Sequence, residues 1–293
     1  MFYNRYRKKT EGVIRFFDLS SPITKIVTVL IFVACIIMLL ISIFPAIWVF
    51  LASFKDIAEF RKSATILPSD FDFSKYTKTW NELKFTRYYI NSFISVTGSV
   101  VCAIIFNGLL AYVLGVLKPK GHKIVFTLVM WSLLIPPTTS IVALYVNINK
   151  IGLNQSFLPL WLAMGANAFW VVLFKQYFES LPKEYIEAAR LDGCNDFQIF
   201  LKIIMPLSKP IIAVVTIFAV TAAWSDFLLP FLVLAGTDKE TVMVRLFEFR
   251  TASKSTDVDV LRAIAFSIIP PTIVFALFQK QITKGIGAGG IKG

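Results

Sequence analysis

Charged residues are scarce in this sequence, and their scarcity excludes an ordinary soluble domain. Only 16% of the 293 residues are charged, whereas 56% are hydrophobic. A soluble domain carries about 25% charged residues. Because so little charge cannot cover a water-facing surface, part of the surface must face lipid.

Catalytic and metal-binding patterns are also missing. The chain has one histidine, His122, and three cysteines that lie far apart, Cys35, Cys102 and Cys194. Their spacing fits neither a metal site nor a disulfide framework. The sequence has no H-E-x-x-H, no nucleophile elbow and no G-x-x-x-x-G-K-[ST] phosphate loop. These absences argue against a membrane enzyme, and any ATP would have to be handled by another chain.

The net charge of +12 could point to nucleic acid, but its distribution favours a membrane protein. Lys and Arg fall in short stretches between long apolar runs, as the positive-inside rule expects. The sequence therefore gives no support for nucleic-acid binding.

Apolar runs long enough to cross a bilayer recur along the chain. A spanning helix needs about 20 apolar residues. We predict an all-α, polytopic membrane protein with about six transmembrane helices, at 26–51, 90–116, 123–147, 156–177, 210–234 and 260–279. They form a transmembrane domain over 26–282, between an N-terminal segment, 1–25, and a glycine-rich tail, 283–293.

The basic residues in short loops predict the orientation. The N-terminal segment carries an excess of Lys and Arg, and the loop at 117–122 carries Lys without any acid, which places both in the cytoplasm. With six spans, both termini and the segment 178–209 are then cytoplasmic. The loops 52–89 and 235–259 lie outside, and we expect one or two short interfacial helices within 52–89.

The polar segment 178–209 has the pattern of a helix, a glycine turn and a second helix. Ser180 can cap the first helix and Pro182 suits its first turn. Gly193 supplies a left-handed end, and Asn195 with Gln198 resembles a capping box. Taken from the residues alone, the segment could contact a partner protein or rest on the membrane.

The same segment resembles the EAA loop of ABC importer permeases, and we call residues 178–209 the EAA segment. The family pattern is Glu-Ala-Ala, three residues, Gly, nine residues, then Ile-x-Leu-Pro, and Met205 replaces the usual Leu here. The stretch AWSDFLLPFLVL at 223–234 and the C-terminal FQKQITKGIGAGGIKG are similar to segments of sugar permeases. Over nearly its whole length the chain resembles MalG-type subunits of carbohydrate importers.

This resemblance implies a permease subunit of an ATP-binding-cassette importer that moves a carbohydrate by alternating access. An oligosaccharide is expected, with an acidic one left open. The implied partners are a second permease, two ATPase subunits and an extracytoplasmic binding protein, with ATP and Mg on the ATPase and no cofactor on this chain. The residues implied to couple to the ATPase are Glu187, Ala188, Ala189, Arg190, Asp192, Gly193, Ile203 and Pro206.

Polar residues inside the apolar runs are candidates for the translocation pathway. Asp226, beside Trp224, is the exceptional acid within a span and should face the bundle interior or water. Pro136 and Pro137 interrupt a span, and Thr138 and Thr139 follow them. Five asparagines are further candidates, Asn91, Asn107, Asn147, Asn149 and Asn167. For Asp226 and for each asparagine, hydrogen bonding between helices is an equally good interpretation.

Two other transporter classes remain as alternatives. A secondary transporter usually carries several intramembrane ionisable groups and inverted repeats, which this sequence does not show. An ABC permease for a non-sugar solute would share the EAA pattern but not the WSDFLLP and C-terminal similarities.

Overall fold

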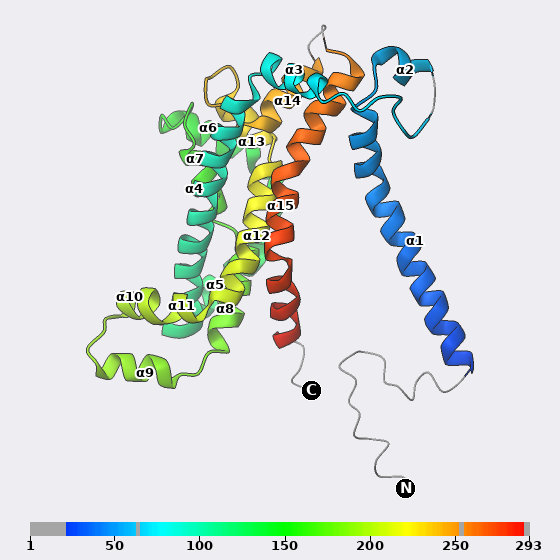
Figure 1. The fold of residues 1–293 in the computed structure, drawn as a ribbon. Coiled ribbons are helices and arrows are strands. Elements are labelled where there is room, and N and C mark those ends of the chain that lie inside the picture. Colours follow the sequence, from blue (N-terminus) through cyan, green and yellow to red (C-terminus); the bar gives the residue numbers. More distant parts are fainter. Residues whose placement is uncertain (1–21, 63–64, 252–254, 290–293) are drawn as a thin grey trace. The chain divides into compact units, whose positions relative to one another are not determined.

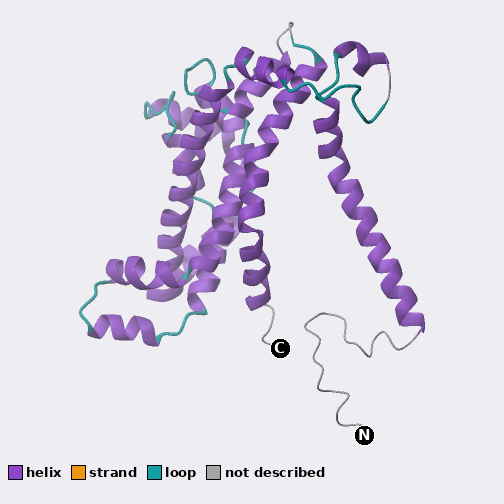
Figure 2. Ribbon diagram, viewed as in Figure 1, coloured by secondary structure: helices purple, strands orange, loops and turns teal. Residues whose placement is uncertain are grey.

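A computed structural model describes residues 22–62, 65–251 and 255–289, and all regular structure in them is helical (Figures 1 and 2). The all-α, polytopic fold class is therefore confirmed. The chain divides into two compact units, residues 1–71 and 72–293.

The first unit contains one long apolar helix and one short helix. These are α1 (Pro22–Ala52) and α2 (Ile57–Lys62). The 31 residues of α1 extend over about 46 Å, which exceeds a bilayer's hydrocarbon core. α1 contains the predicted span 26–51, and α2 is one of the short helices expected in the segment 52–89.

The second unit is a bundle whose helices pack around α4 and α12. Its first half comprises α3 (Ser74–Glu82), α4 (Phe85–Tyr112), η3 (Val113–Leu117), α5 (His122–Ser132), η4 (Pro137–Ser140), α6 (Ile141–Lys150), α7 (Leu158–Met164) and α8 (Ala168–Glu179). Its second half comprises α9 (Glu184–Leu191), α10 (Asp196–Ile199), η5 (Phe200–Ile204), α11 (Met205–Leu207), α12 (Lys209–Ser225), α13 (Leu228–Leu234), α14 (Val242–Thr251) and α15 (Asp257–Gly289). α4 packs against α7, α8 and α12, and α12 packs against α15 (Figure 1).

Within the described residues, three helices are long and apolar enough to cross a membrane. They are α1, the continuous α4–η3 helix and the first part of α15, Asp257–Gln279. Two bent pairs of helices are also apolar enough when each pair is taken together: α7 with α8, and the stretch Asp196–Leu207 with α12. If each pair is one span, the described residues contain five spans. The predicted span 123–147 is divided between α5 and α6, so its crossing stays a prediction.

Two predicted spans are interrupted where no break was expected. The span 156–177 consists of α7 and α8, which meet at 47°. The span 210–234 ends as a helix at Ser225, Asp226 is extended, and α13 begins at Leu228. In both places a polar residue caps the following helix: Asn167 accepts a hydrogen bond from the α8 backbone, and Asp226 accepts hydrogen bonds from the α13 backbone. A capping side chain stabilises a helix start, so the chain can bend there.

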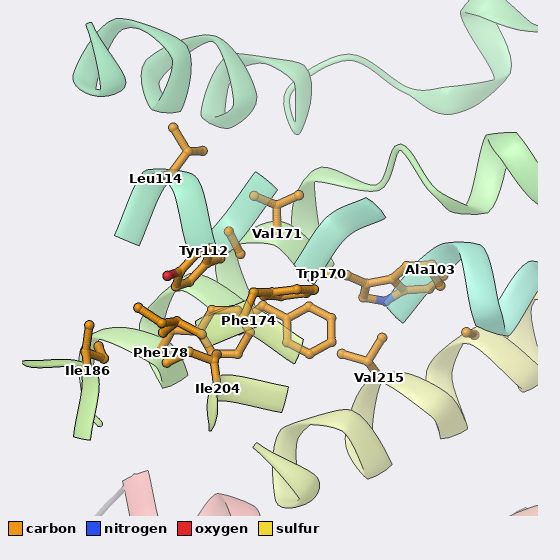
Figure 3. Close-up of a cluster of buried hydrophobic side chains, with 14 of the residues drawn as sticks. Ala103, Tyr112, Leu114, Trp170, Val171, Phe174, Phe178, Ile186, Ile204 and Val215 are labelled. Carbon is orange, nitrogen blue, oxygen red and sulfur yellow. The ribbon is translucent and has the colours of Figure 1, made fainter. Parts of the chain in front are cut away.

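The largest core cluster lies where α4, α8 and α12 meet the EAA segment. Figure 3 shows Trp170, Phe174 and Phe178 of α8 packed with Tyr112 of α4 and Val215 of α12. Residues from α9, α10 and η5 complete the same cluster. The apolar core therefore holds the EAA segment against the bundle.

Candidate functional site: the EAA segment

The EAA segment is a compact sequence of short helices at the end of the second unit opposite α3 and α14 (Figure 1). It runs from the last turn of α8 through α9, α10, the π-helix η5 and α11. An 84° bend at Ser208 separates it from α12. The predicted helix, turn and second helix are confirmed.

The turn between α9 and α10 has the predicted chemistry. Gly193 has a φ of +81°, the left-handed conformation that favours glycine, and nothing lies within 4 Å of where a Cβ would stand. Asn195 accepts a hydrogen bond from the Gln198 backbone at 2.9 Å, and the Gln198 side chain accepts one from the Asn195 backbone at 3.0 Å. This reciprocal pair is the predicted capping box.

The predicted cap at Ser180 is wrong. Ser180 follows the last residue of α8, and its hydroxyl donates to the Tyr177 carbonyl at 2.7 Å. The next helix begins only at Glu184, with Lys183 before it and no side-chain cap. The serine hydroxyl is satisfied by the preceding turn, so it cannot cap the following one.

One face of α9 is fixed in the core. Ile186 and Ala189 are three positions apart, so they share a face of the helix, and both belong to the core cluster. Ala189 is 5% exposed. Ala189 is among the residues implied to couple to the ATPase, but its small side chain packs against the bundle and leaves little surface for direct contact with a partner.

The other face of α9 is open. Glu187 and Ala188 are exposed, and Asp192 is exposed just after the helix. Leu191 is 89% exposed and Tyr185 is 54% exposed. These five residues form a mixed polar and apolar surface that no other described part of the chain covers.

Arg190 stabilises the EAA segment from within. Its guanidinium pairs with the Asp196 carboxylate at 3.3 Å, which joins the end of α9 to the start of α10. Both side chains are more than half exposed, so this pair contributes at most about 1 kcal/mol. Ile203 is half-buried in η5, and Pro206 is exposed in the first turn of α11, beside the bend into α12.

Two of the predicted pathway residues are buried in the opposite half of the bundle. Asn91 donates to the carbonyls of Asp238 and Glu240, at 2.9 and 3.0 Å. Trp224 is 5% exposed and donates to the Ser267 carbonyl at 2.9 Å. Their polar atoms join helices to each other, which favours the structural interpretation for both residues.

Asn167 and Asn107 stabilise the break between α7 and α8. Asn167 caps α8 by accepting from the Trp170 backbone, and its own N–H donates to the Asn107 side chain at 2.8 Å. The Asn107 amide donates to the carbonyls of Ala103 and Met164, at 2.7 and 3.0 Å. Asn107 thus satisfies backbone groups that the break leaves without helical partners.

Asp226 occupies the break between α12 and α13. Its carboxylate accepts hydrogen bonds from the backbone N–H groups of Leu228 and Leu229. The side chain is only partly buried. The contacts show a helix-capping role, and they leave part of the carboxylate open to the surroundings.

The proline break between α5 and α6 lies on the surface of the second unit. Pro136 is extended, with φ −60° and ψ 130°, and Pro137 begins the short 3-10 helix η4. Thr138 and Thr139 are exposed. The Thr139 hydroxyl donates to the Pro136 carbonyl at 2.7 Å, so this hydroxyl supports the turn.

Sequence reasoning missed three ion pairs, which lie at opposite ends of the bundle. Arg87 pairs with Asp238 at 2.8 Å and joins α4 to the turn before α14. Glu179 pairs with Lys175 and Lys118 at the end of α8. Lys175 and Glu179 are four residues apart, a helical charge pattern that could have revealed their pair. No local pattern reveals the other two contacts.

Comparison with known proteins gives consistent results for family, sequence and fold. Residues 88–287 match the family described as binding-protein-dependent transport system inner membrane component. The diacetylchitobiose uptake system permease protein NgcG of Streptomyces coelicolor is 29% identical over 255 residues, which cover 85% of this chain and 84% of the relative. The arabinooligosaccharides transport system permease protein AraQ of Halalkalibacterium halodurans is 31% identical over 258 residues, covering 86% and 92%.

A solved structure has the same fold. It is a crystal structure of a bacterial ABC transporter involved in the import of the acidic polysaccharide alginate. The match has a TM-score of 0.79 and 26% identity, and it covers 89% of this chain and 98% of that chain.

Proposed function

Since this chain belongs to the family of binding-protein-dependent transport system inner membrane components, we propose that it is the permease subunit of an ATP-driven carbohydrate importer. The observation that carries the proposal is the EAA segment, with one face of α9 anchored in the core and the other exposed. A surface built in this way can receive a push from a partner and pass it to α4, α8 and α12.

The cargo is an oligosaccharide. Relatives of this chain are named for diacetylchitobiose and arabinooligosaccharides, and the similar solved transporter imports alginate. The net charge of +12 is compatible with an acidic oligosaccharide, although much of it follows the expected positive-inside pattern. Neutral and acidic oligosaccharides are therefore both included in the test below.

ATP hydrolysis belongs to separate subunits. This chain has no G-x-x-x-x-G-K-[ST] phosphate loop, so ATP and Mg bind to two partner ATPase subunits. A second permease subunit completes the pore, and an extracytoplasmic binding protein delivers the sugar. This chain itself binds no cofactor.

The exposed face of α9 docks on the ATPase. Glu187 and Asp192 offer charges, Ala188 permits close approach, and Leu191 offers an apolar contact. Gly193 sets the direction in which the chain leaves this face. When the ATPase subunits close on ATP, α9 moves with them, and the anchored face transmits the movement into the bundle.

The chain spans the inner membrane several times with both termini in the cytoplasm. The EAA segment and the 117–122 loop are then cytoplasmic, and α3 and the turn before α14 lie outside. This arrangement agrees with the basic residues in the short loops. Within the second unit, it also agrees with the opposite positions of the EAA segment and of α3 and α14 (Figure 1).

The proposal can be tested in proteoliposomes that hold this chain with its two kinds of partner subunit. We would measure uptake of arabino-oligosaccharides, diacetylchitobiose, galacturonan oligosaccharides and alginate oligosaccharides. We expect at least one to accumulate only when both ATP and the binding protein are present. Uptake that needs neither, and that collapses with the proton gradient, would contradict the proposal and favour a secondary transporter.

A further inference from the structure

A cluster of three charged side chains joins the end of α8 to the end of the α4–η3 helix. The Glu179 carboxylate lies between two ammonium groups, with Oε1 3.0 Å from Lys118 Nζ and Oε2 2.9 Å from Lys175 Nζ. Glu179 is the last residue of α8, directly before the EAA segment turns toward α9. Lys118 follows the last residue of η3, with a left-handed φ of +49°.

Two further contacts bring the same elements together. The Lys175 ammonium lies 4.4 Å from the ring centre of Phe126 in α5, a cation–π contact. Gly115 of η3 lies directly against α8, because a Cβ there would stand 3.1 Å from Lys175 and 3.4 Å from Glu179. The elements η3, α5 and α8 all contact one another. Their ends therefore form one packed corner around Glu179.

Glu179 is the one negative charge in this cluster, so it attracts both lysine ammonium groups, which repel each other. The Lys175 side chain is 15% exposed and that of Glu179 is 32% exposed, so both are partly shielded from water. Ion pairs with reduced exposure are screened less than surface pairs. Without the carboxylate, two lysine ammonium groups would face the same space, and the loop at 118–121 would lose its ionic attachment to α8.

We propose that Glu179 is a positioning residue, which makes the 118–121 loop move together with the EAA segment. The inference rests on the proposed function, since it concerns how a push on α9 reaches the α4–α5 side of the bundle. A push on α9 reaches Glu179 at the end of α8. The ion pair with Lys118 passes it to the end of η3, and Lys175, held by Glu179, passes it to α5 through the ring of Phe126. The core cluster supplies a second, apolar route into α4 and α12, so loss of Glu179 weakens the transmission but does not abolish it.

The first experiment measures sugar transported per ATP hydrolysed in proteoliposomes that hold the complete transporter. The probe is whichever sugar of the panel above the wild type accumulates. Glu179→Gln keeps the shape of the side chain and removes its charge. We expect the ratio of sugar to ATP to fall about two- to fivefold, the range that partly exposed ion pairs support. A purely structural role would lower the amount of complex and leave this ratio unchanged.

A matched control comes from an exposed ion pair elsewhere in the second unit. Lys78 and Glu82 are 4.0 Å apart on α3, with side chains 77% and 53% exposed. Glu82→Gln makes the same chemical change there and should leave the ratio unchanged. Lys118→Met removes one of the two ion pairs and should lower the ratio no more than Glu179→Gln does. The double variant should be no worse than Glu179→Gln alone, because Glu179→Gln already removes the pair with Lys118.

The second experiment observes the movement without a sugar. Cys35, Cys102 and Cys194 are replaced by serine, and spin labels are placed at Lys120→Cys, in the loop, and Lys183→Cys, before α9. With Glu179 present, the distribution of distances between the two labels should be narrow. It should also have the same mean in the nucleotide-free complex and in the complex trapped with ATP and vanadate. In Glu179→Gln, trapping should broaden this distribution or shift its mean.

The outcomes separate the inference from the proposed function. If the wild type shows no uptake that depends on ATP and binding protein, the proposed function fails. The positioning role of Glu179 is overturned if the wild type transports normally and Glu179→Gln keeps both the wild-type ratio of sugar to ATP and the narrow, unshifted distribution of label distances.

Discussion

The EAA segment and the interior of the bundle use polar side chains in opposite ways. In the EAA segment, Glu187 and Asp192 are exposed on the surface that includes the open face of α9. In the bundle, Asn91 and Asn107 are buried, and each donates to two backbone carbonyls of this chain. A side chain whose hydrogen bonds are satisfied internally contributes to the fold, whereas an exposed polar surface on a rigid support can contribute to recognition.

This difference changes how polar residues in apolar runs should be interpreted. A polar group away from water must find a partner, and in a helical bundle the partner is usually a neighbouring helix or a helix end. Asn167, Trp224 and Asp226 each bond to backbone groups of the described chain. Trp224 is buried, whereas Asn167 and Asp226 are partly buried, and only Asp226 of these three carries an ionisable group, so it remains the best candidate for a further role in the pathway.

The largest expected effect is at the turn of the EAA segment. Gly193→Asp adds a charge to the docking surface and places a side chain at φ +81°. The backbone strain costs about 1–2 kcal/mol, too little to unfold the bundle. We expect normal membrane insertion but loss of ATPase co-purification and uptake at background, measured on purified membranes and proteoliposomes.

Gly152→Asp is the matched control for this prediction. Gly152 has φ +70° and also has nothing within 4 Å of a Cβ, but it lies in the loop after α6. The strain and the added charge are therefore similar. If both variants lose the ATPase equally, the effect is general destabilisation, and the distinction between the two regions fails.

We expect the second-largest effect from a substitution in the interior of the bundle. Asn107→Leu leaves the Asn167 N–H and the Met164 carbonyl without their partner. Each unsatisfied buried group costs about 1–3 kcal/mol. We expect a clearly lower melting temperature in detergent, with the ratio of sugar to ATP unchanged in whatever complex survives. A normal melting temperature with a changed ratio would instead assign Asn107 to the transport mechanism.

Asp226 permits a sharper comparison between capping and transport. Asp226→Asn keeps an oxygen that can accept from Leu228 and Leu229, whereas Asp226→Ala removes the cap at a cost of about 1 kcal/mol. We expect Asp226→Ala to impair transport with the ATPase still bound. If Asp226→Asn transports normally, capping explains the role. If it is impaired as strongly, the charge itself is needed.

The smallest effect concerns the pH dependence of stability. Glu240 is 4% exposed in the turn before α14, and its carboxylate accepts from the Gly236 backbone at 2.8 Å. Burial raises the pKa of Glu240 most and the neighbouring Glu248 raises it further, while Gly236 and Arg245 act in the opposite direction. The folded state therefore holds a proton that the unfolded state releases, and stability falls as pH rises from about 4.3 through the raised pKa.

Glu240→Gln should reduce this pH dependence. The amide can accept from Gly236 and donate to Glu248, and it carries no charge to bury. Melting temperatures measured from pH 5 to pH 8 should fall less steeply in the variant than in the wild type. Equal slopes would show that Glu240 does not carry the effect.

The helix and turn pattern of the EAA segment could be predicted from sequence because its signals are local. Gly193 and the pair Asn195 and Gln198 act within one turn of chain, and the structure confirms both. Ser180 misled the prediction because its hydroxyl could equally bond backward, and it bonds to Tyr177. Which face of α9 is buried could not be predicted, since that depends on the distant residues of α4, α8 and α12.

The breaks in the bundle were harder to predict. Pro136 and Pro137 mark one break by their chemistry. The breaks before α8 and α13 depend on Asn167 and Asp226, polar residues that fit a continuous span equally well on sequence alone. Only their hydrogen bonds to the following helix, together with Asn107 from α4, distinguish a cap from a pathway residue.

The exposed face of α9 can be tested by light-activated cross-linking in the assembled transporter. A photoreactive residue would replace Leu191, which is 89% exposed, and in a second sample Phe73, which is 67% exposed before α3. The account predicts that the probe at Leu191 links to the ATPase subunit and that the probe at Phe73 does not. If the probe at Leu191 links only to lipid while the ATPase is present in the complex, α9 is not the docking surface.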